Sequence, residues 1–239
     1  MCEQKKYSDL FIDFDDTLYD THGNAVIALA ELFEYFGWEA HFPDPELFYK
    51  AYWETNVTLW GQYAKGKIER QYLIIERFRR PLSLGLGTMD LSDENILRIS
   101  DKFLDLCAVK PGVVPDAHEL VQYLRKKGYR LHICSNGFHE VQYRKLRSCG
   151  LLDAFDTIIL SEDAGANKPS PQFFAHAFER THASVQTTLM IGDNFTTDIH
   201  GAQSVGLDVI YFNRHPENGP APEPVNYEVH SLKEVMQIL

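Results

Sequence analysis

Two acidic side chains follow a short apolar run near the start of the chain. The run Leu10–Ile12 predicts a buried strand, and Asp13 and Asp15 stand one residue apart just beyond it. Past the carboxyl end of a strand in an open α/β sheet, both side chains can face the crevice where ligands bind. Carboxylates buried together are costly unless a cation compensates their charge. The pair therefore points to a charged site, although an acidic turn after an edge strand fits these residues alone.

Two further loops carry polar groups that suit an anion. A predicted strand at residues 130–134 runs into Ser135-Asn136-Gly137, which offers hydroxyl and backbone donors ahead of a helix. An ordinary helix cap with a turn glycine is the alternative. Lys168 precedes another predicted helix and can neutralise a phosphoryl oxygen or hold neighbouring carboxylates, unless it is simply a solvated loop lysine.

A fourth strand end brings in more carboxylates. The predicted strand at residues 188–191 ends in Gly192-Asp193-Asn194, and Asp198 lies in the first turns of the next helix. Carboxylates from two strand ends, together with water and a substrate oxygen, form a hard octahedral site suited to Mg²⁺. The Gly-Asp-Asn triplet is weak evidence alone, but four polar strand ends in this order are much more specific.

The elements that must position these residues fall into two blocks. Residues 22–108 contain no predicted strand and about four helices, whereas helices and strands alternate after Pro111-Gly112. The predicted helices of the first block lie at residues 25–36, 46–64, 68–84 and after Ser92, through about Leu106. Those of the second block lie at 115–127, 138–148, 171–180, 196–204 and after Ser231, with strands at 130–134, 157–160, 188–191 and 208–212 and a surface loop at 214–226.

This alternation predicts an α/β fold with a mostly parallel sheet and right-handed crossovers. The first strand can join that sheet only if the helical block is an insertion. We therefore expect a Rossmann-like, three-layer core of residues 1–20 and 109–239, with residues 21–108 inserted after the first strand as an alpha-helical cap domain.

The composition limits the partners. The chain has 239 residues, 44% hydrophobic and 24% charged, as in ordinary soluble globular proteins. Its net charge of −11 argues against nonspecific binding of nucleic-acid polymers or anionic membranes. The start of the chain lacks the apolar core of a signal peptide, so a cytoplasmic location is expected. The cysteines Cys2, Cys107, Cys134 and Cys149 are widely spaced and suggest neither a zinc site nor a disulfide framework.

The four motifs together resemble the haloacid dehalogenase (HAD) superfamily of phosphohydrolases. Its signature is DxDxT, a Ser or Thr after a strand, a Lys, and an acidic GD…D. These correspond to Asp13-Phe14-Asp15-Asp16-Thr17, Ser135-Asn136-Gly137, Lys168-Pro169, and Gly192-Asp193 through Asp198. The resemblance covers the whole chain, and the helical insert directly after the first motif is similar to the superfamily's alpha-helical cap class.

The resemblance implies a mechanism. Asp13 would attack phosphorus and form an aspartyl-phosphate, while Asp15 would protonate the leaving oxygen and then take a proton from water. Because a free aspartic acid has a pKa of about 3.9, the environment must keep Asp15 protonated at the start. Dehalogenase activity is disfavoured, since that branch attacks carbon, needs no Mg²⁺ and has no use for the second acid.

The resemblance also implies ligands and supporting residues. Mg²⁺ would be held by Asp13, Asp193 and the backbone carbonyl of Asp15. The phosphoryl oxygens would be bound by Ser135, the amide of Asn136 and Lys168. Outside this set, Asp198 would orient Lys168 or a metal-bound water, Thr17 would brace the loop, and Asp16 is expected to be structural.

The resemblance implies that the substrate is a small phosphorylated metabolite. The segment Leu59-Trp60…Gly66-Lys67-Ile68 and the Phe138 after Ser135-Asn136-Gly137 look like bacterial house-cleaning pyrimidine 5′-nucleotidases. Aromatic residues of the insert could stack on a base, or simply pack helix against helix. The aromatics in question are Trp38, Trp53, Trp60, Tyr52 and Tyr63. A phosphoglycolate or sugar-phosphate phosphatase, a phosphomutase and a non-catalytic binding protein are the alternatives, and a monomer or weak dimer is expected.

Overall fold

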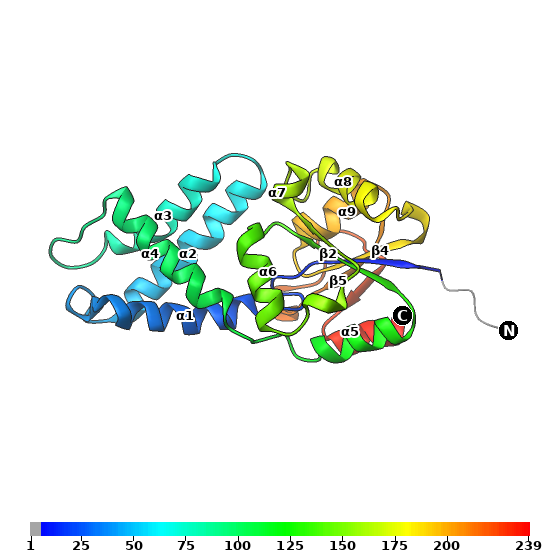
Figure 1. Ribbon diagram of the computed structural model, residues 1–239, viewed down its shortest axis with the longest axis horizontal. Helices are drawn as coiled ribbons and strands as arrows, with labels where there is room; N and C mark the ends of the chain where they lie inside the picture. Colours follow the sequence, from blue (N-terminus) through cyan, green and yellow to red (C-terminus); the bar gives the residue numbers. More distant parts are fainter. Residues whose placement is uncertain (1–5) are drawn as a thin grey trace. The chain divides into compact units, whose positions relative to one another are not determined.

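The computed structural model describes residues 6–239, and the chain divides into two compact units (Figure 1). The first unit, here the core unit, comprises residues 6–21 and 111–239. The second, here the helical unit, comprises residues 22–110. The chain thus leaves the core unit soon after its first strand and returns to it about ninety residues later.

The core unit is built on a six-stranded parallel sheet, which confirms the predicted fold class. Its strands are β1 (Asp9–Ile12), β2 (Arg130–Ser135), β3 (Thr157–Leu160), β4 (Thr188–Gly192), β5 (Asp208–Phe212) and β6 (Tyr227–Val229). Their order is β3-β2-β1-β4-β5-β6, so the first strand is central. Ile12 pairs with Ile133 on one side and Ile191 on the other. Because parallel strands end at the same edge, the residues after β1, β2 and β4 emerge side by side.

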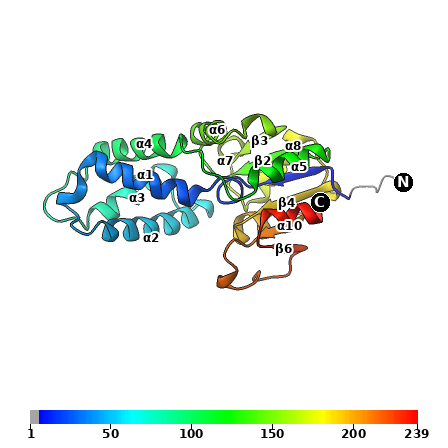
Figure 2. The same ribbon diagram turned by 90° about the horizontal axis from the view of Figure 1, so that it is seen from below.

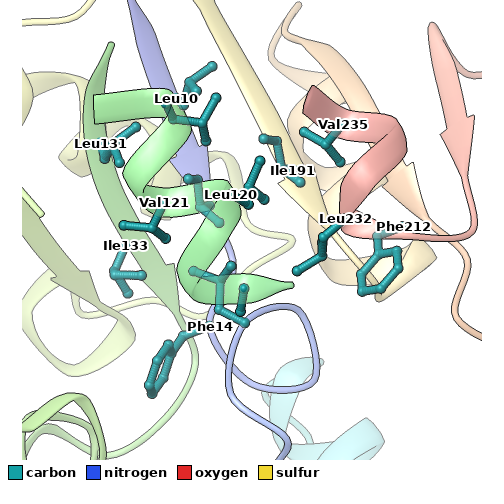
Figure 3. Close-up of a cluster of buried hydrophobic side chains, with 14 of the residues drawn as sticks. Leu10, Phe14, Leu120, Val121, Leu131, Ile133, Ile191, Phe212, Leu232 and Val235 are labelled. Atoms are coloured by element: carbon teal, nitrogen blue, oxygen red, sulfur yellow. The ribbon is translucent and has the colours of Figure 1, made fainter. Parts of the chain in front are cut away.

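Both faces of the sheet are buried, and the central strands alternate between them. In β1, Leu10 and Ile12 belong to one hydrophobic cluster, whereas Phe11 belongs to the other. On the first face lie α5 (Ala117–Lys126) and α10 (Leu232–Ile238), as Figure 3 shows. On the second lie α8 (Pro171–Thr181) and α9 (Gly201–Ser204). Helices on two faces of one parallel sheet make the expected three layers.

The remaining helices of the core unit stand close to strand ends. α6 (His139–Ser148) follows β2, and the one-turn α7 (Ser161–Ala164) follows β3. A π-helical turn, Phe195–His200, connects β4 to α9. Its first amides are capped by Asn194, whose side-chain oxygen accepts from the backbone N–H of Thr196 and Thr197.

The helical unit contains α1 (Thr21–Phe36, which begins in the last core residue), α2 (Pro45–Ala64), α3 (Arg70–Leu82) and α4 (Asp93–Ala108), seen from a second side in Figure 2. Residues 22–110, all described, include no strand. Asp44 caps α2 and Ser92 caps α4, each accepting from a backbone N–H of the first turn. An aromatic cluster that includes Phe48, Tyr52 and Phe78 fills the space between these helices.

The structure corrects several predicted boundaries. The predicted loop at 214–226 is followed by β6, a three-residue strand too short to show an alternating pattern. The helix expected from residue 115 begins at Ala117, because Asp116 takes a left-handed φ of 67°. The helix expected at 196–204 is a π-helical turn followed by a short α-helix. Sequence periodicity does not distinguish a π turn from an α turn over six residues.

Two further features concern the cysteines and the length of the apolar helices. Cys107, Cys134 and Cys149 are buried, and Cys2 lies outside the described residues. Within residues 6–239, no helix combines the length and apolar character that crossing a bilayer requires.

The helical unit offers a matched pair of leucines that tests its core. Leu82 is 1% exposed and Leu84 is 50% exposed. We expect Leu82→Ala to lower the free energy of unfolding by about 2–5 kcal/mol, because it removes a buried side chain and leaves a cavity. Leu84→Ala should change it by about 0.5 kcal/mol or less.

Urea unfolding followed by tryptophan fluorescence measures this unit selectively, since Trp38, Trp53 and Trp60 all lie within it. Equal effects of the two substitutions would contradict the packing described above.

Candidate active site

The side chain of Asp13 lies where β1 ends, between the ends of β2 and β4. Its backbone N–H donates to the carbonyl of Ile191 at 2.9 Å, which extends the β1–β4 pairing by one residue. One carboxylate oxygen accepts from Lys168 Nζ at 2.6 Å, and the other from Thr17 Oγ1 at 3.1 Å. Asp13 is 7% exposed, so this polar group is nearly buried.

Thr17 links the ends of β1 and β4. Its hydroxyl lies 3.1 Å from Asp13 Oδ2 and 3.0 Å from Asp193 Oδ1, and it accepts from the backbone N–H of Asp193 at 3.1 Å. A hydroxyl has a single proton. Thr17 can therefore donate to Asp13 Oδ2 or to Asp193 Oδ1, but not to both at once.

Lys168 is the ammonium at the centre of this group. It is 1% exposed, and its Nζ also donates to Asp198 Oδ1 at 2.7 Å. Asn136 holds the backbone of Lys168 reciprocally: its side-chain nitrogen donates to the Lys168 carbonyl at 2.9 Å, and its oxygen accepts from the Lys168 N–H at 2.8 Å. The side chain of Asn136 thus positions Lys168, while the backbone amide of Asn136 remains the predicted phosphate donor.

Both carboxylate oxygens of Asp198 accept hydrogen bonds from groups of the protein. Besides Lys168, its two oxygens accept from Thr197 Oγ1 at 3.1 Å and from the Asn194 N–H at 3.0 Å. Gly192 leaves the space that this carboxylate occupies, because a Cβ at that position would overlap it. Glycine is required here for close approach rather than for a special backbone angle.

Electrostatics favours a cation beside Asp13 and Asp193. Burial, with the charges of neighbouring carboxylates, raises the pKa of Asp13 to about 8 even though Lys168 lies beside it. Burial and the charges of Asp13 and Asp198 raise the pKa of Asp193 well above its ordinary value. One ammonium thus faces three carboxylates, and oxygens of all three lie within 4.8 Å of one another.

These residues fit a hard divalent cation such as Mg²⁺. Carboxylate oxygens are its preferred protein ligands, and a positive ion would offset the charge that raises both pKa values. Asp198 is already bound to Lys168, so Asp13 and Asp193 are the side chains best placed to hold the ion. The side chain of Asp15 lies outside this group, which leaves its backbone carbonyl as the predicted ligand.

The environment of Asp15 differs from the expectation that it is kept protonated. Burial disfavours its charge, but the Lys145 ammonium and hydrogen bonds from Lys145, Thr21 and Gln142 outweigh burial, so its pKa is lowered. Lys145 Nζ lies 2.6 Å from Asp15 Oδ1, and Thr21 Oγ1 donates to the same oxygen at 2.7 Å. Asp15 is therefore a carboxylate at neutral pH.

Sequence reasoning missed Lys145 and Gln142, the two α6 residues that contact Asp15. Gln142 Nε2 donates to Asp15 Oδ2 at 2.5 Å and to Ser135 Oγ at 2.7 Å. The sequence carried a signal, because Gln142 and Lys145 stand next to the apolar Val141 and Leu146 at helical spacing. All four side chains are buried in α6. Two of these four are polar and stand at the spacing of a core-facing stripe. Polar residues at core positions of a helix that follows a polar strand end are candidates for a site.

The loop at 214–226, for which the sequence suggested no role, reaches the first motif. Arg214 Nη1 donates to Asp16 Oδ1 at 3.1 Å, and its Nη2 donates to Asp20 Oδ1 at 3.3 Å. Arg214 also lines a pocket of the core unit that borders Asp193. Asp16 has a left-handed φ of 61° and forms an ion pair with Arg214. Both features suit the structural role expected for Asp16.

The insert aromatics are mostly packing residues. Trp38 and Tyr52 are buried, and their rings contact Phe48. Trp60 and Tyr63 are partly exposed and contact each other edge to face. Base stacking by the helical unit therefore has fewer candidate rings than the sequence suggested.

The chain is similar to known hydrolases over most of its length. A family model described as haloacid dehalogenase-like hydrolase matches residues 10–206. HAD-hydrolase YfnB of Bacillus subtilis is 32% identical over 98% of this chain and 96% of its own length. Its crystal structure bound to magnesium superposes with a TM-score of 0.87, at 31% identity over 98% of this chain and 99% of that one.

Two other relatives have names that state a substrate. Pyrimidine 5′-nucleotidase PynA of Streptococcus pneumoniae is 29% identical over 98% of this chain and 95% of its own. Glyceraldehyde 3-phosphate phosphatase of Methanothermobacter thermautotrophicus is 27% identical over 95% of this chain and 98% of its own.

The raised carboxylate pKa values predict how stability depends on pH and on Mg²⁺. Because the pKa of Asp13 is about 8 in the folded chain and about 3.8 ordinarily, the folded chain binds more protons between these values. Stability without metal should therefore fall as pH rises from about 4 to about 8. Mg²⁺ binds the ionised carboxylates, so it should raise the melting temperature more at about pH 8 than at about pH 5.

Thermal unfolding with Mg²⁺ and with chelator measures this difference. Asp193→Asn should largely remove the response, whereas Asp163→Asn, on an exposed residue outside the site, should keep it. A Mg²⁺ effect of equal size at both pH values would contradict the assignment.

Proposed function

Because the chain belongs to the haloacid dehalogenase-like hydrolase family, we propose that it is a magnesium-dependent phosphatase that forms an aspartyl-phosphate on Asp13. The observation that carries this proposal is the arrangement of Asp13, a nearly buried carboxylate 2.6 Å from the Lys168 ammonium at the end of the central strand. In this proposal the helical unit is the cap that selects the substrate, and the core unit performs the reaction.

Asp13 is suited to attack phosphorus. An oxygen of its carboxylate would form a bond to phosphorus in line with the leaving oxygen, whose bond to phosphorus breaks. Water would then attack the aspartyl-phosphate and release inorganic phosphate, which restores Asp13. Lys168 Nζ, Ser135 and the amide of Asn136 would bind the phosphoryl oxygens and stabilise the charge that develops on them.

Proton transfer is assigned to Asp15. As a carboxylate, it can accept the proton of the attacking water in the second step. The first step needs a proton on the leaving oxygen, and a phosphate monoester with a second pKa of about 6 carries one in its monoanionic form. That proton would pass to Asp15 and from there to the leaving oxygen. In the second step, Asp15 would hand the proton taken from water to the released phosphate, which returns Asp15 to a carboxylate.

Mg²⁺ would be held by Asp13, Asp193 and the backbone carbonyl of Asp15. When bound, it supplies positive charge that reduces the repulsion between the attacking carboxylate and the phosphate. Thr17 keeps the carboxylates of Asp13 and Asp193 close together, and Asp198 keeps Lys168 beside Asp13.

A pyrimidine nucleoside 5′-monophosphate is the proposed substrate. The support is similarity to PynA over nearly the whole of both chains, together with the nucleotidase-like segments of the sequence. A sugar phosphate is the second candidate, supported by similarity of nearly equal extent to a glyceraldehyde 3-phosphate phosphatase. The catalytic residues proposed here are the same for both, so the difference between them must come from groups that contact the rest of the substrate.

The decisive test is phosphate release from nucleoside monophosphates, sugar phosphates and phosphoglycolate, with Mg²⁺ and with chelator. We expect pyrimidine monophosphates to be preferred and chelator to abolish release. Asp13→Asn should reduce turnover of every ester by about three orders of magnitude or more. Asp163→Asn, on an exposed residue outside the site, should leave turnover unchanged.

Unchanged hydrolysis in Asp13→Asn would overturn the mechanism. If the best substrate has no nucleobase, the proposed phosphatase activity stands and the proposed nucleotidase specificity is wrong.

The ion pair between Lys145 and Asp15 predicts a change in the pH profile. Lys145→Met removes the charge that holds the pKa of Asp15 low. The acidic limb of the kcat/KM profile should therefore move upward by about 1 pH unit or more, since Asp15 then loses its proton at higher pH. Lys145→Arg, which retains the charge, should restore the limb largely to its original position, and an unmoved limb in Lys145→Met would contradict the assignment of the base.

A further inference from the structure

The hydroxyl of Ser135 has both of its lone pairs occupied from within the protein. Ser135 Oγ accepts from the backbone N–H of Gly137 at 3.0 Å and from Gln142 Nε2 at 2.7 Å. A serine hydroxyl has two lone pairs and one proton, so its remaining capacity is to donate. The acceptor recorded for this proton is Asp15 Oδ2 at 3.4 Å, a long distance for an O–H···O bond. The proton is thus available to a better-placed acceptor.

Gln142 is held in one orientation by Asp15. The carboxylate of Asp15 can only accept hydrogen bonds, so the nitrogen of the Gln142 amide must face it. That orientation leaves Gln142 Oε1 buried without a hydrogen-bond partner in the described part of the chain. An unsatisfied buried oxygen destabilises the fold, because it loses its hydrogen bonds to water. The two acceptors, Asp15 and Ser135, outweigh this cost and fix the direction of the amide.

The turn before α6 keeps the amide close to the hydroxyl. Gln142 is fully buried, and a Cβ at Gly137 would overlap its side chain. Gly137 therefore both donates to Ser135 and leaves the space that Gln142 fills. Gln142, Ser135 and Asp15 form a closed triangle of polar atoms with separations of 2.5, 2.7 and 3.4 Å.

We propose that Gln142 is a positioning residue of the phosphate site. Its two amide hydrogens are used on Asp15 and Ser135, and this directs the Ser135 proton outward to an oxygen of the substrate's phosphoryl group. The inference rests on the proposed function, in which Ser135 binds a phosphoryl oxygen of the substrate. Gln142 itself would not contact the substrate, so its effect should depend entirely on Ser135 and Asp15.

The test uses inorganic phosphate as the probe and the Mg²⁺-loaded full chain. Gln142→Glu keeps the shape of the side chain but replaces its donor with an acceptor, so Ser135 would turn its proton toward residue 142. We expect about tenfold weaker phosphate binding, measured by calorimetry and as competitive inhibition of ester hydrolysis. Gln142→Met removes the donor without adding charge and should give a smaller loss. Arg147→Gln, on the exposed side of α6, should bind phosphate as the wild type does.

A double-mutant cycle separates positioning from simple packing. If Gln142 acts on phosphate through Ser135, Gln142→Met should weaken phosphate binding by less than about twofold when Ser135 is already alanine. A packing role would instead lower the melting temperature and weaken binding equally in both backgrounds, which would overturn the inference.

The outcomes also separate this inference from the proposed function. Normal phosphate affinity in Gln142→Glu and Gln142→Met, with an active wild type, would overturn the role of Gln142 alone. Absence of ester hydrolysis by the wild type would overturn the proposed function, and calorimetry with phosphate would still test Gln142. A wild type that does not bind phosphate at all would overturn both.

Discussion

The unbalanced charge at the carboxyl ends of β1 and β4 is the constraint on which the rest of the site depends. Asp13, Asp193 and Asp198 converge there, and Lys168 is the ammonium that lies among them. Buried like charges are costly, and the protein meets this cost only in part, with a buried lysine and a shared hydroxyl. The parallel sheet brings the carboxylates together at its edge, and the space between them is suited to a cation because compensation is incomplete.

The surroundings of Asp13 and Asp15, two carboxylates of one short motif, move their pKa values in opposite directions. Asp13 shares Lys168 with Asp198 and has a raised pKa, whereas Asp15 has Lys145, Thr21 and Gln142 and a lowered one. Environments that move two pKa values apart are a common basis for dividing acid, base and nucleophile roles. Here Asp13 lies buried among other carboxylates whose charge Lys168 offsets only in part, whereas Asp15 faces Lys145 and Gln142 on the buried face of α6.

Much of this arrangement could be predicted from the sequence, because the governing signals were local. Apolar runs that end in polar residues located the ends of β1, β2 and β4, and alternation with helices indicated a parallel sheet. The predictions missed features that depend on tertiary contacts. β6 is defined by its pairing with β5 rather than by its three residues, and Lys145 contacts Asp15 across 130 positions of sequence. The lowered pKa of Asp15 follows from that contact. The spacing of α6 marks Lys145 as a core-facing residue, but it does not indicate that its partner is Asp15.

The central place of β1 has a consequence for how the chain assembles. Its partners β2 and β4 lie more than a hundred residues further along, so the sheet is dominated by contacts between distant parts of the sequence. In the helical unit, α3 packs against α2 and α4, its neighbours in the chain, as in folds of low contact order. During synthesis, β1 must remain without its neighbours until the strands that flank it have been made. The residues that hold Asp13 in place therefore meet late, because the site cannot form until Lys168, Asp193 and Asp198 have all been made.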